Sequence, residues 1–290
     1  MNGLDLSDRR PIAARPRRTA LYMPGSNPRA IEKARSLPCD AVILDLEDAV
    51  APDAKVAARD AVLAALAFGG FGHREVTVRV NGFGTPWMVE DFARVAAGRP
   101  DAIVVPKVDT PEQAAEAVRL AAGVPVWAMI ESPRAVLDAD RIAAVDGVTA
   151  LLAGMADFAK DIGARPGIDR LEILYALQRM LIAARAAGIV ALDGVHADIH
   201  DLAGLEVACR QGAAMGFDGK TLVHPNQIEP ANRAFSPDPA AIDEARGLIA
   251  AHEAALGEGR GVTTHNGRMV EVLHVEAARR LLAFADVISG

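Results

Sequence analysis

Four carboxylates follow short apolar runs of the chain. Asp45 and Glu47 stand in LDLED at 44–48, Glu131 follows WAMI, and Asp157 follows LLAGMA. Carboxylates that folding brings together repel one another unless a cation neutralises them, and oxygen ligands favour a hard ion such as Mg²⁺. We predict that Glu131 and Asp157 bind Mg²⁺, because either would be costly to bury unpaired. Solvated carboxylates that cap the next helix are the alternative.

Arg79 is a lone cation within the apolar run VTVRVNG. A planar guanidinium pairs well with a carboxylate, so we predict that Arg79 binds a carboxylate of the substrate. A structural ion pair with Asp45 or Glu47 is the alternative, and both hold if these acids orient the guanidinium. For Glu47 and Asp48 we predict contact with the metal through water, against the alternative of acids that precede a helix near Pro52.

His224, in VHPNQI, either donates a hydrogen bond to a substrate carbonyl or caps the helix that follows, and the sequence leaves both open. The spacing of the other histidines does not suit a zinc site; these are His73, His196, His200, His252, His265 and His274. Neither a GxSxG elbow nor a Walker loop occurs, which excludes the common serine hydrolases and NTPases.

Short apolar runs rich in β-branched residues indicate eight strands. They span 19–24, 41–46, 75–80, 102–108, 124–131, 148–155, 189–195 and 219–225. Helical patterns separate them, and prolines suit the first turns of six helices, at Pro28, Pro52, Pro86, Pro111, Pro133 and Pro225. Eight such units predict an α/β fold of the TIM (β/α)8 barrel type, with a doubly wound open sheet as the alternative. In a barrel the residues described above meet at the carboxyl ends of the strands.

The last 50 residues lie outside the barrel count. A helix is expected over 240–259, a short run over 262–268 and a last helix to about 287. We predict a mobile tail over 1–17, a catalytic barrel over 18–238 and a C-terminal helical arm over 239–290 that packs on, or crosses to, another subunit.

Composition narrows the class of protein. The 290 residues are 51% hydrophobic and 24% charged with a net charge of −7, which suits a globular protein and disfavours nucleic acid as a partner. No run approaches the ~20 apolar residues of a membrane helix. The two cysteines, Cys39 and Cys209, have no CxxC spacing, so we expect a reducing cytoplasm.

Taken in order, several segments resemble the citrate lyase β-subunit family, the CitE-like CoA ester lyases of the HpcH/HpaI aldolase superfamily. The segments are YMPGSNPR, DAVILDLEDAVAPDAK, VRVNGFG, IVVPKV, MIESP, LLAGMADFAKDIG, AAMGFDGKTLVHPNQI and GRMVEVLHVEAARR. The resemblance implies a TIM barrel, a homotrimer, Mg²⁺ on Glu131 and Asp157, and a substrate carboxylate on Arg79. It also implies contacts with CoA, which fall on Tyr22, Arg29, Lys33, Lys55 and Arg59.

The chemistry that the resemblance implies is cleavage of a 3-hydroxydicarboxyl-CoA, of the malyl-, citramalyl- or citryl-CoA type, to an acyl-CoA and a 2-oxo acid. Arg79 with Asp45 and Glu47 is the expected catalytic group. Many relatives place an acid-base Asp in the C-terminal arm, which reaches a neighbour's site, and the matching residue here is Glu271. A malyl-CoA thioesterase is the first alternative. A citrate lyase β chain that acts on an acyl carrier protein thioester is the second, and a non-catalytic binding barrel is the third.

Overall fold

The computed structural model describes residues 15–289 and contains two compact units. Among the described residues, one unit is formed by Arg17–Phe235, and the other by residues 236–289 together with 15–16. Of the tail predicted over 1–17, residues 1–14 lie outside the described part. Arg17 itself is anchored, because its Nη2 donates to Glu75 Oε1 over 2.8 Å.

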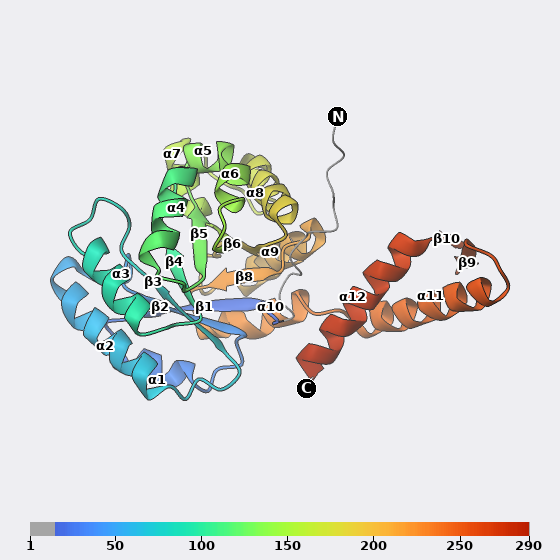
Figure 1. Ribbon diagram of the computed structural model, residues 1–290, viewed down its shortest axis with the longest axis horizontal. Helices are drawn as coiled ribbons and strands as arrows, with labels where there is room; N and C mark the ends of the chain where they lie inside the picture. The colour runs from blue at the N-terminus through green and yellow to red at the C-terminus, as the bar shows by residue number, and fades with distance from the viewer. Residues whose placement is uncertain (1–14, 290) are drawn as a thin grey trace. The chain divides into compact units, whose positions relative to one another are not determined.

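Eight parallel strands close into a barrel in the order β1 to β8 (Figure 1). They are β1 (Thr19–Pro24), β2 (Ala41–Asp45), β3 (Glu75–Arg79), β4 (Ala102–Val105), β5 (Val126–Ile130), β6 (Val148–Ala153), β7 (Val190–Asp193) and β8 (Gly219–Leu222). Pairing of β1 with β8 completes the ring. The predicted TIM barrel is confirmed. Most strands end one to three residues earlier than the sequence suggests, because the polar residues after them leave the sheet and form the rim.

Helices surround the strands. They are α1 (Pro28–Ala34), α2 (Lys55–Phe68), α3 (Met88–Ala97), α4 (Pro111–Leu120), α5 (Pro133–Leu137), α6 (Ala139–Ala143), α7 (Met155–Asp161), α8 (Leu174–Ala187), α9 (Leu202–Met215) and α10 (Ile228–Ala234), with 3-10 turns η2 (Pro52–Ala54), η3 (Leu171–Ile173) and η4 (Pro225–Gln227). Five of the six prolines occupy first-turn positions as predicted. Pro86 does not, since it precedes Trp87, the N-cap of α3.

Alternate residues of each strand face two different cores. Val42 and Leu44 of β2 pack outward against the helices. Ala41 and Ile43 pack inside the barrel with a second cluster that includes Trp127. Because successive side chains of a strand point to opposite faces, the next inward position on β2 is Asp45. The parity of the apolar pattern therefore decides which polar side chains reach the barrel mouth.

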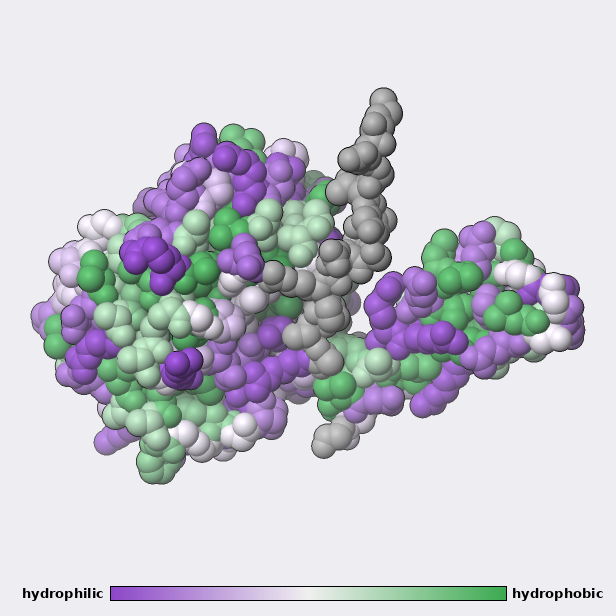
Figure 2. Space-filling view, viewed as in Figure 1, coloured by the Kyte–Doolittle hydropathy of each residue, from purple (hydrophilic) through white to green (hydrophobic). Residues whose placement is uncertain are grey.

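The C-terminal unit is a pair of helices with a small hairpin between them. α11 (Pro239–Gly257) packs against α12 (Val272–Ser289), and the antiparallel strands β9 (Thr263–His265) and β10 (Arg268–Val270) join them. Four apolar residues near the hairpin are half or more exposed: Val262, Met269, Val272 and Leu273. Figure 2 shows hydrophobic surface at the hairpin end of this unit. Over residues 15–289, the helices are too short or too polar to span a bilayer.

Candidate active site

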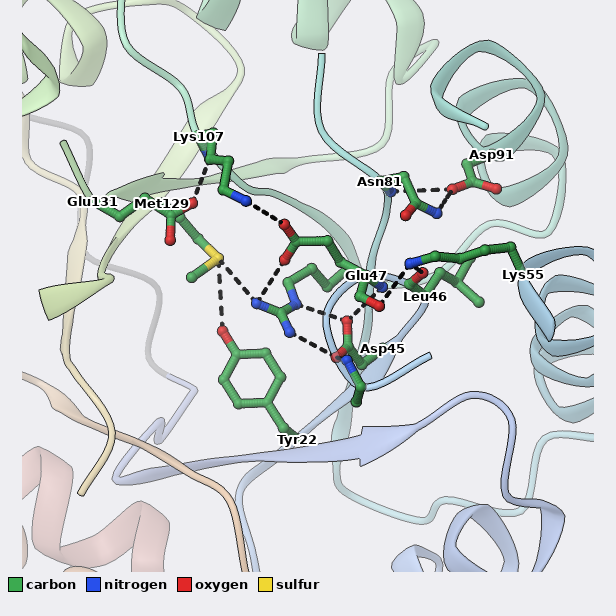
Figure 3. A network of polar contacts seen from close by, with 12 residues as sticks. Tyr22, Asp45, Leu46, Glu47, Lys55, Asn81, Asp91, Lys107, Met129 and Glu131 are labelled. Carbon is green, nitrogen blue, oxygen red and sulfur yellow. Dashed lines mark hydrogen bonds and ion pairs between the residues drawn. The ribbon is translucent and has the colours of Figure 1, made fainter. Parts of the chain in front are cut away.

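A charge cluster occupies the carboxyl ends of β2 and β3 (Figure 3). Asp45 and Arg79 are register partners on these neighbouring strands. Arg79 Nε and Nη2 donate to the two Asp45 carboxylate oxygens over 2.7 and 2.6 Å, and Arg79 Nη1 lies 2.9 Å from Glu47 Oε2. The structural ion pair weighed for Arg79 is therefore present, with both acids at once.

The Arg79 guanidinium is buried and lies over the Tyr22 ring, 4.7 Å from its centroid. Burial lowers the pKa of Arg79, but its hydrogen bonds to Asp45 and the charges of Tyr22, Asp45 and Glu47 together raise the pKa by more, so the side chain stays charged. Three of its five N–H groups contact carboxylate oxygens. Nη1 also lies 4.0 Å from Met129 Sδ, a weak acceptor. A ligand carboxylate that displaces this sulfur contact can use the N–H groups that no acid holds, so the ion pair and the predicted substrate contact are compatible.

Glu47 links this cluster to β4. Its Oε1 lies 3.2 Å from Lys107 Nζ, while its other oxygen faces Arg79. Burial raises the pKa of Glu47, although Arg79 and Lys107 oppose the shift. For Lys107, burial lowers the pKa, but the carboxylates of Glu47, Asp48 and Glu131 together raise it by more. Asp48, by contrast, is exposed, and its charge adds to the raised pKa values of Glu47 and Lys107.

Glu131 follows β5 and is 5% exposed. Its Oε1 accepts a hydrogen bond from the Lys107 backbone N–H over 2.5 Å. Burial raises the pKa of Glu131 to about 7, the Lys107 N–H opposes the shift, and the charges of Glu47 and Asp157 add to it. A buried carboxylate with acidic neighbours is an environment that a cation would relieve.

Asp157 lies in the first turn of α7, which follows β6, the neighbour of β5. Gly154, just before α7, makes room for Glu131, because a Cβ atom there would lie 2.3 Å from the Glu131 Cβ. Within residues 15–289 no three His, Cys, Asp or Glu side chains form a metal cluster. Two carboxylates are the number that Mg²⁺ usually takes from a protein, so the predicted pair fits this ion.

A cavity of about 660 Å³ opens beside α7. Met155 and Lys160 of α7 line one side, and Arg170 and His196 line others. Because these residues follow β6 and β7, the cavity lies at the same end of the barrel as the charge cluster. The rim therefore offers space for a substrate larger than the cluster alone could hold.

The residues predicted to contact CoA separate into two groups. Arg29 and Lys33 are exposed on α1, and Tyr22 lies in the charge cluster. Lys55 and Arg59 are only 7% and 5% exposed. They are four residues apart and in phase with the buried face of α2, a spacing that the sequence already contained.

Both buried cations have internal partners, and their predicted contact with CoA stays a prediction. Lys55 Nζ donates to the backbone carbonyls of Leu46 and Glu47 over 2.8 and 2.7 Å. Arg59 Nη1 donates to Asp91 Oδ1 over 2.8 Å. These contacts tie α2 to the segment after β2 and to α3.

Replacing Lys55 by methionine is expected to affect stability more than CoA affinity. The change leaves two buried carbonyls without a donor. Each unsatisfied carbonyl lowers the free energy of unfolding by about 1–3 kcal/mol. We expect a lower thermal midpoint and a KM for the CoA ester within threefold of wild type. Calorimetry and steady-state kinetics measure the two effects. A tenfold rise in KM at unchanged stability would instead show that Lys55 contacts CoA.

His224 acts as a cap in the structure. Its side chain accepts from the Asn226 backbone N–H, and Gln227 completes a capping box at the start of η4. Of the two alternatives for His224, the structure contains the cap. Its role toward a substrate carbonyl stays a prediction.

Glu271 belongs to the C-terminal unit, between β10 and α12. Its backbone N–H donates to His274 Nδ1 over 3.1 Å, and its side chain is partly exposed. Its action in a neighbour's site stays a prediction.

Two site residues were missed by sequence reasoning. Lys107 falls within the predicted strand 102–108 and was not predicted as a site residue, and the structure gives it a φ of 54°, which is unusual for a residue other than glycine. Gly154 was read as part of a motif, although a glycine between a strand and an acid is a signal of close approach. Neither contact with Glu131 can be read from spacing, because β4, β5 and β6 meet only in the folded barrel.

Comparison with known proteins agrees with this geometry. The family model HpcH/HpaI aldolase/citrate lyase matches residues 18–225. A (3S)-malyl-CoA thioesterase of Cereibacter sphaeroides (strain KD131 / KCTC 12085) is 45% identical over 277 residues, covering 96% of this chain and 97% of the relative. An L-malyl-CoA/beta-methylmalyl-CoA lyase of Cereibacter sphaeroides (strain ATCC 17025 / ATH 2.4.3) is 34% identical and covers 97% and 98%.

Among solved structures, CitE from Mycobacterium tuberculosis in complex with magnesium, acetoacetate and coenzyme A superposes with a TM-score of 0.80 at 30% identity. The match covers 94% of this chain and 99% of that one. A family model that spans the barrel, relatives that span nearly the whole chain and a shared fold lead to one conclusion. The protein belongs to the HpcH/HpaI aldolase/citrate lyase family, as its motifs predicted.

Proposed function

We propose that the protein is a Mg²⁺-dependent CoA ester lyase. Its substrate is a 3-hydroxydicarboxyl-CoA of the malyl-, citramalyl- or citryl-CoA type, and its products are an acyl-CoA, such as acetyl-CoA, and a 2-oxo acid. The observation that carries the proposal is the pair of carboxylates, Glu131 and Asp157, beside a buried guanidinium, Arg79, at one barrel mouth. The CoA- and magnesium-bound CitE relative supports the same ligands here.

Glu131 and Asp157 are the residues that would hold the metal. When bound, Mg²⁺ supplies Lewis-acid stabilisation of negative charge on substrate oxygens. Arg79 binds the carboxylate of the substrate with the N–H groups that no acid holds, while Asp45 and Glu47 fix the plane of the guanidinium. Because both acids are buried, this orientation is set before the substrate arrives.

Cleavage breaks the bond between C2 and C3 of the thioester. The 3-hydroxyl gives up its proton to a base at the rim and becomes the carbonyl of the 2-oxo acid, and the electrons of the broken C2–C3 bond move to C2 as a thioester enolate. Protonation at C2 completes the acyl-CoA, which requires a positioned acid. We assign this acid to Glu271, supplied by the arm of a neighbouring copy in a homotrimer. Its side chain is one methylene longer than the usual Asp.

The CoA moiety is assigned to the exposed cations of α1. Arg29 and Lys33 are four residues apart, so they share one helix face and suit phosphate oxygens. Tyr22, on β1 before α1, has its ring 4.7 Å from the Arg79 guanidinium. The large cavity beside α7 gives further room at the rim.

A second candidate is a malyl-CoA thioesterase, and the relative that is 45% identical over nearly the whole chain favours it. In that reaction water attacks the thioester carbonyl, the C–S bond breaks, and the products are the free hydroxy acid and CoA thiol. The same metal and guanidinium would serve both reactions. The two differ in which bond breaks, and their products therefore distinguish them.

Product analysis tests the proposal. Purified protein with Mg²⁺ is mixed with malyl-CoA, citramalyl-CoA and citryl-CoA, and 2-oxo acid and free thiol are assayed in parallel. A lyase releases 2-oxo acid and acyl-CoA in equal amounts with no free thiol. Free thiol with intact hydroxy acid identifies the thioesterase. Turnover only after an acyl carrier protein thioester is supplied would instead identify a citrate lyase β chain.

A further inference from the structure

Lys107 contacts two acids of the site in two different ways (Figure 3). It follows β4 after Pro106, in a left-handed backbone conformation with φ of 54°. In this conformation its backbone N–H donates to Glu131 Oε1 over 2.5 Å, and its Nζ lies 3.2 Å from Glu47 Oε1. A backbone of this kind persists only where its surroundings hold it.

The two acids differ in what else holds them. Glu47 shares its carboxylate between Lys107 Nζ and Arg79 Nη1. For Glu131, the Lys107 N–H is the hydrogen bond that opposes its burial. The Lys107 side chain is 53% exposed and both carboxylates are nearly buried, so the ammonium reaches inward from solvent to the cluster.

We propose that Lys107 is a positioning residue with a divided role. Its main chain fixes the Glu131 carboxylate for the metal, and its ammonium fixes Glu47 against Arg79. The inference rests on the proposed function, in which Glu131 binds the metal and Arg79 binds the substrate carboxylate.

A division of this kind predicts separable defects. Loss of the ammonium leaves Glu47 with Arg79 as its one cationic partner in the cluster and frees it to rotate, and the plane of Arg79 relaxes with it. Misplacement of a catalytic group by about 1 Å lowers kcat by roughly 100-fold. The Lys107 N–H is untouched by a side-chain change, so the affinity for Mg²⁺ is retained.

Lys107→Met and Lys107→Gly test the proposal together. Methionine keeps the length of the side chain without its charge, and glycine adopts the left-handed backbone freely. We expect kcat to fall by about 10- to 100-fold in both, with KM and the Mg²⁺ dissociation constant from calorimetry within threefold of wild type. Ethylamine, which fits the exposed space left by Lys107→Gly, is expected to restore part of kcat. The control is Arg119→Met, which removes an exposed cation of α4 paired with Glu116 and leaves kcat unchanged.

Three outcomes would overturn the inference: kcat within threefold of wild type, Mg²⁺ affinity that falls in parallel with kcat, or a loss of kcat that no amine restores. Crystal structures of both variants give a readout without activity. Glu131 is expected in place and Glu47 displaced, and an unmoved Glu47 refutes the role of the ammonium. If the wild-type protein cleaves none of the three CoA esters, the proposed function is contradicted. The crystal structures of the two variants then test the role of Lys107 without any activity.

Discussion

Replacing Glu131 by glutamine is expected to abolish Mg²⁺ binding and to lower kcat by about 1000-fold or more. The metal contributes several kcal/mol to stabilising the charge that develops on substrate oxygens, and each 1.4 kcal/mol is about tenfold in rate. Glutamine has nearly the same shape and still accepts the hydrogen bond from the Lys107 N–H. The loss would therefore report the missing charge. Titration calorimetry with Mg²⁺ and steady-state kinetics measure both effects.

The same change is expected to stabilise the metal-free protein at alkaline pH. Burial raises the pKa of Glu131 from an ordinary 4.5 to about 7. Between these values the folded state holds a proton that the unfolded state releases, so stability falls as pH rises from 4.5 to about 7. Above that window, ionisation of the buried Glu131 lowers the free energy of unfolding by on the order of 3 kcal/mol. The glutamine variant cannot ionise, so it keeps this stability.

Thermal unfolding at pH 5 and pH 8, with and without Mg²⁺, checks this. Glu131→Gln should unfold at a higher temperature than wild type at pH 8 without metal and at a similar temperature at pH 5. Mg²⁺ should stabilise the wild type alone, because only the wild type binds it. Glu112→Gln, an exposed carboxylate on α4, is the control. A variant that still gains stability from Mg²⁺ would refute Glu131 as a ligand.

Replacing Arg79 by methionine is expected to destabilise the protein and to inactivate it. Asp45 is fully buried, and removal of its cationic partner leaves an uncompensated charge, which typically costs about 3–5 kcal/mol. Activity is expected to fall by at least about 100-fold even where the variant is folded, because a bidentate contact to the substrate carboxylate is also lost. Chemical denaturation and kinetics below the unfolding transition measure the two effects.

A double variant separates the structural role of Arg79 from its role toward the substrate. Asp45→Asn combined with Arg79→Met removes the unpaired charge, so most of the stability should return. Activity should not return, since no guanidinium faces the substrate. Recovery of both would mean that Arg79 is only a structural partner of Asp45. Arg79→Lys keeps the charge and supplies the intermediate case, with better stability than Arg79→Met but poor activity.

The apolar runs were sufficient to predict the barrel. Eight short β-branched segments that alternate with helical patterns have few other ways to bury both faces of a parallel sheet. Parity within a strand then placed Asp45 and Arg79 on the inner face, because Ala41 and Ile43 precede Asp45 at even spacing. An ion pair of Arg79 with Asp45 or Glu47 was among the alternatives, because a cation within an apolar strand needs a negative partner.

Roles that depend on contacts between distant segments could not be read in this way. Lys55 and Arg59 look like surface cations in sequence, but the carbonyls of Leu46 and Glu47 and the carboxylate of Asp91 hold them inside. Spacing within one helix predicts which face of the helix a residue lies on. It does not predict which other segments pack against that face.

The sequence by itself determined the family, the barrel and the set of acids and cations at its mouth, because local periodicity and residue type fix these. Only the tertiary structure decided how the charges pair. Arg79 between two acids, Lys107 between Glu47 and Glu131, and Gly154 against Glu131 each join different strands. Such contacts depend on register and on how closely strands approach, and register is set by the packing of the whole barrel.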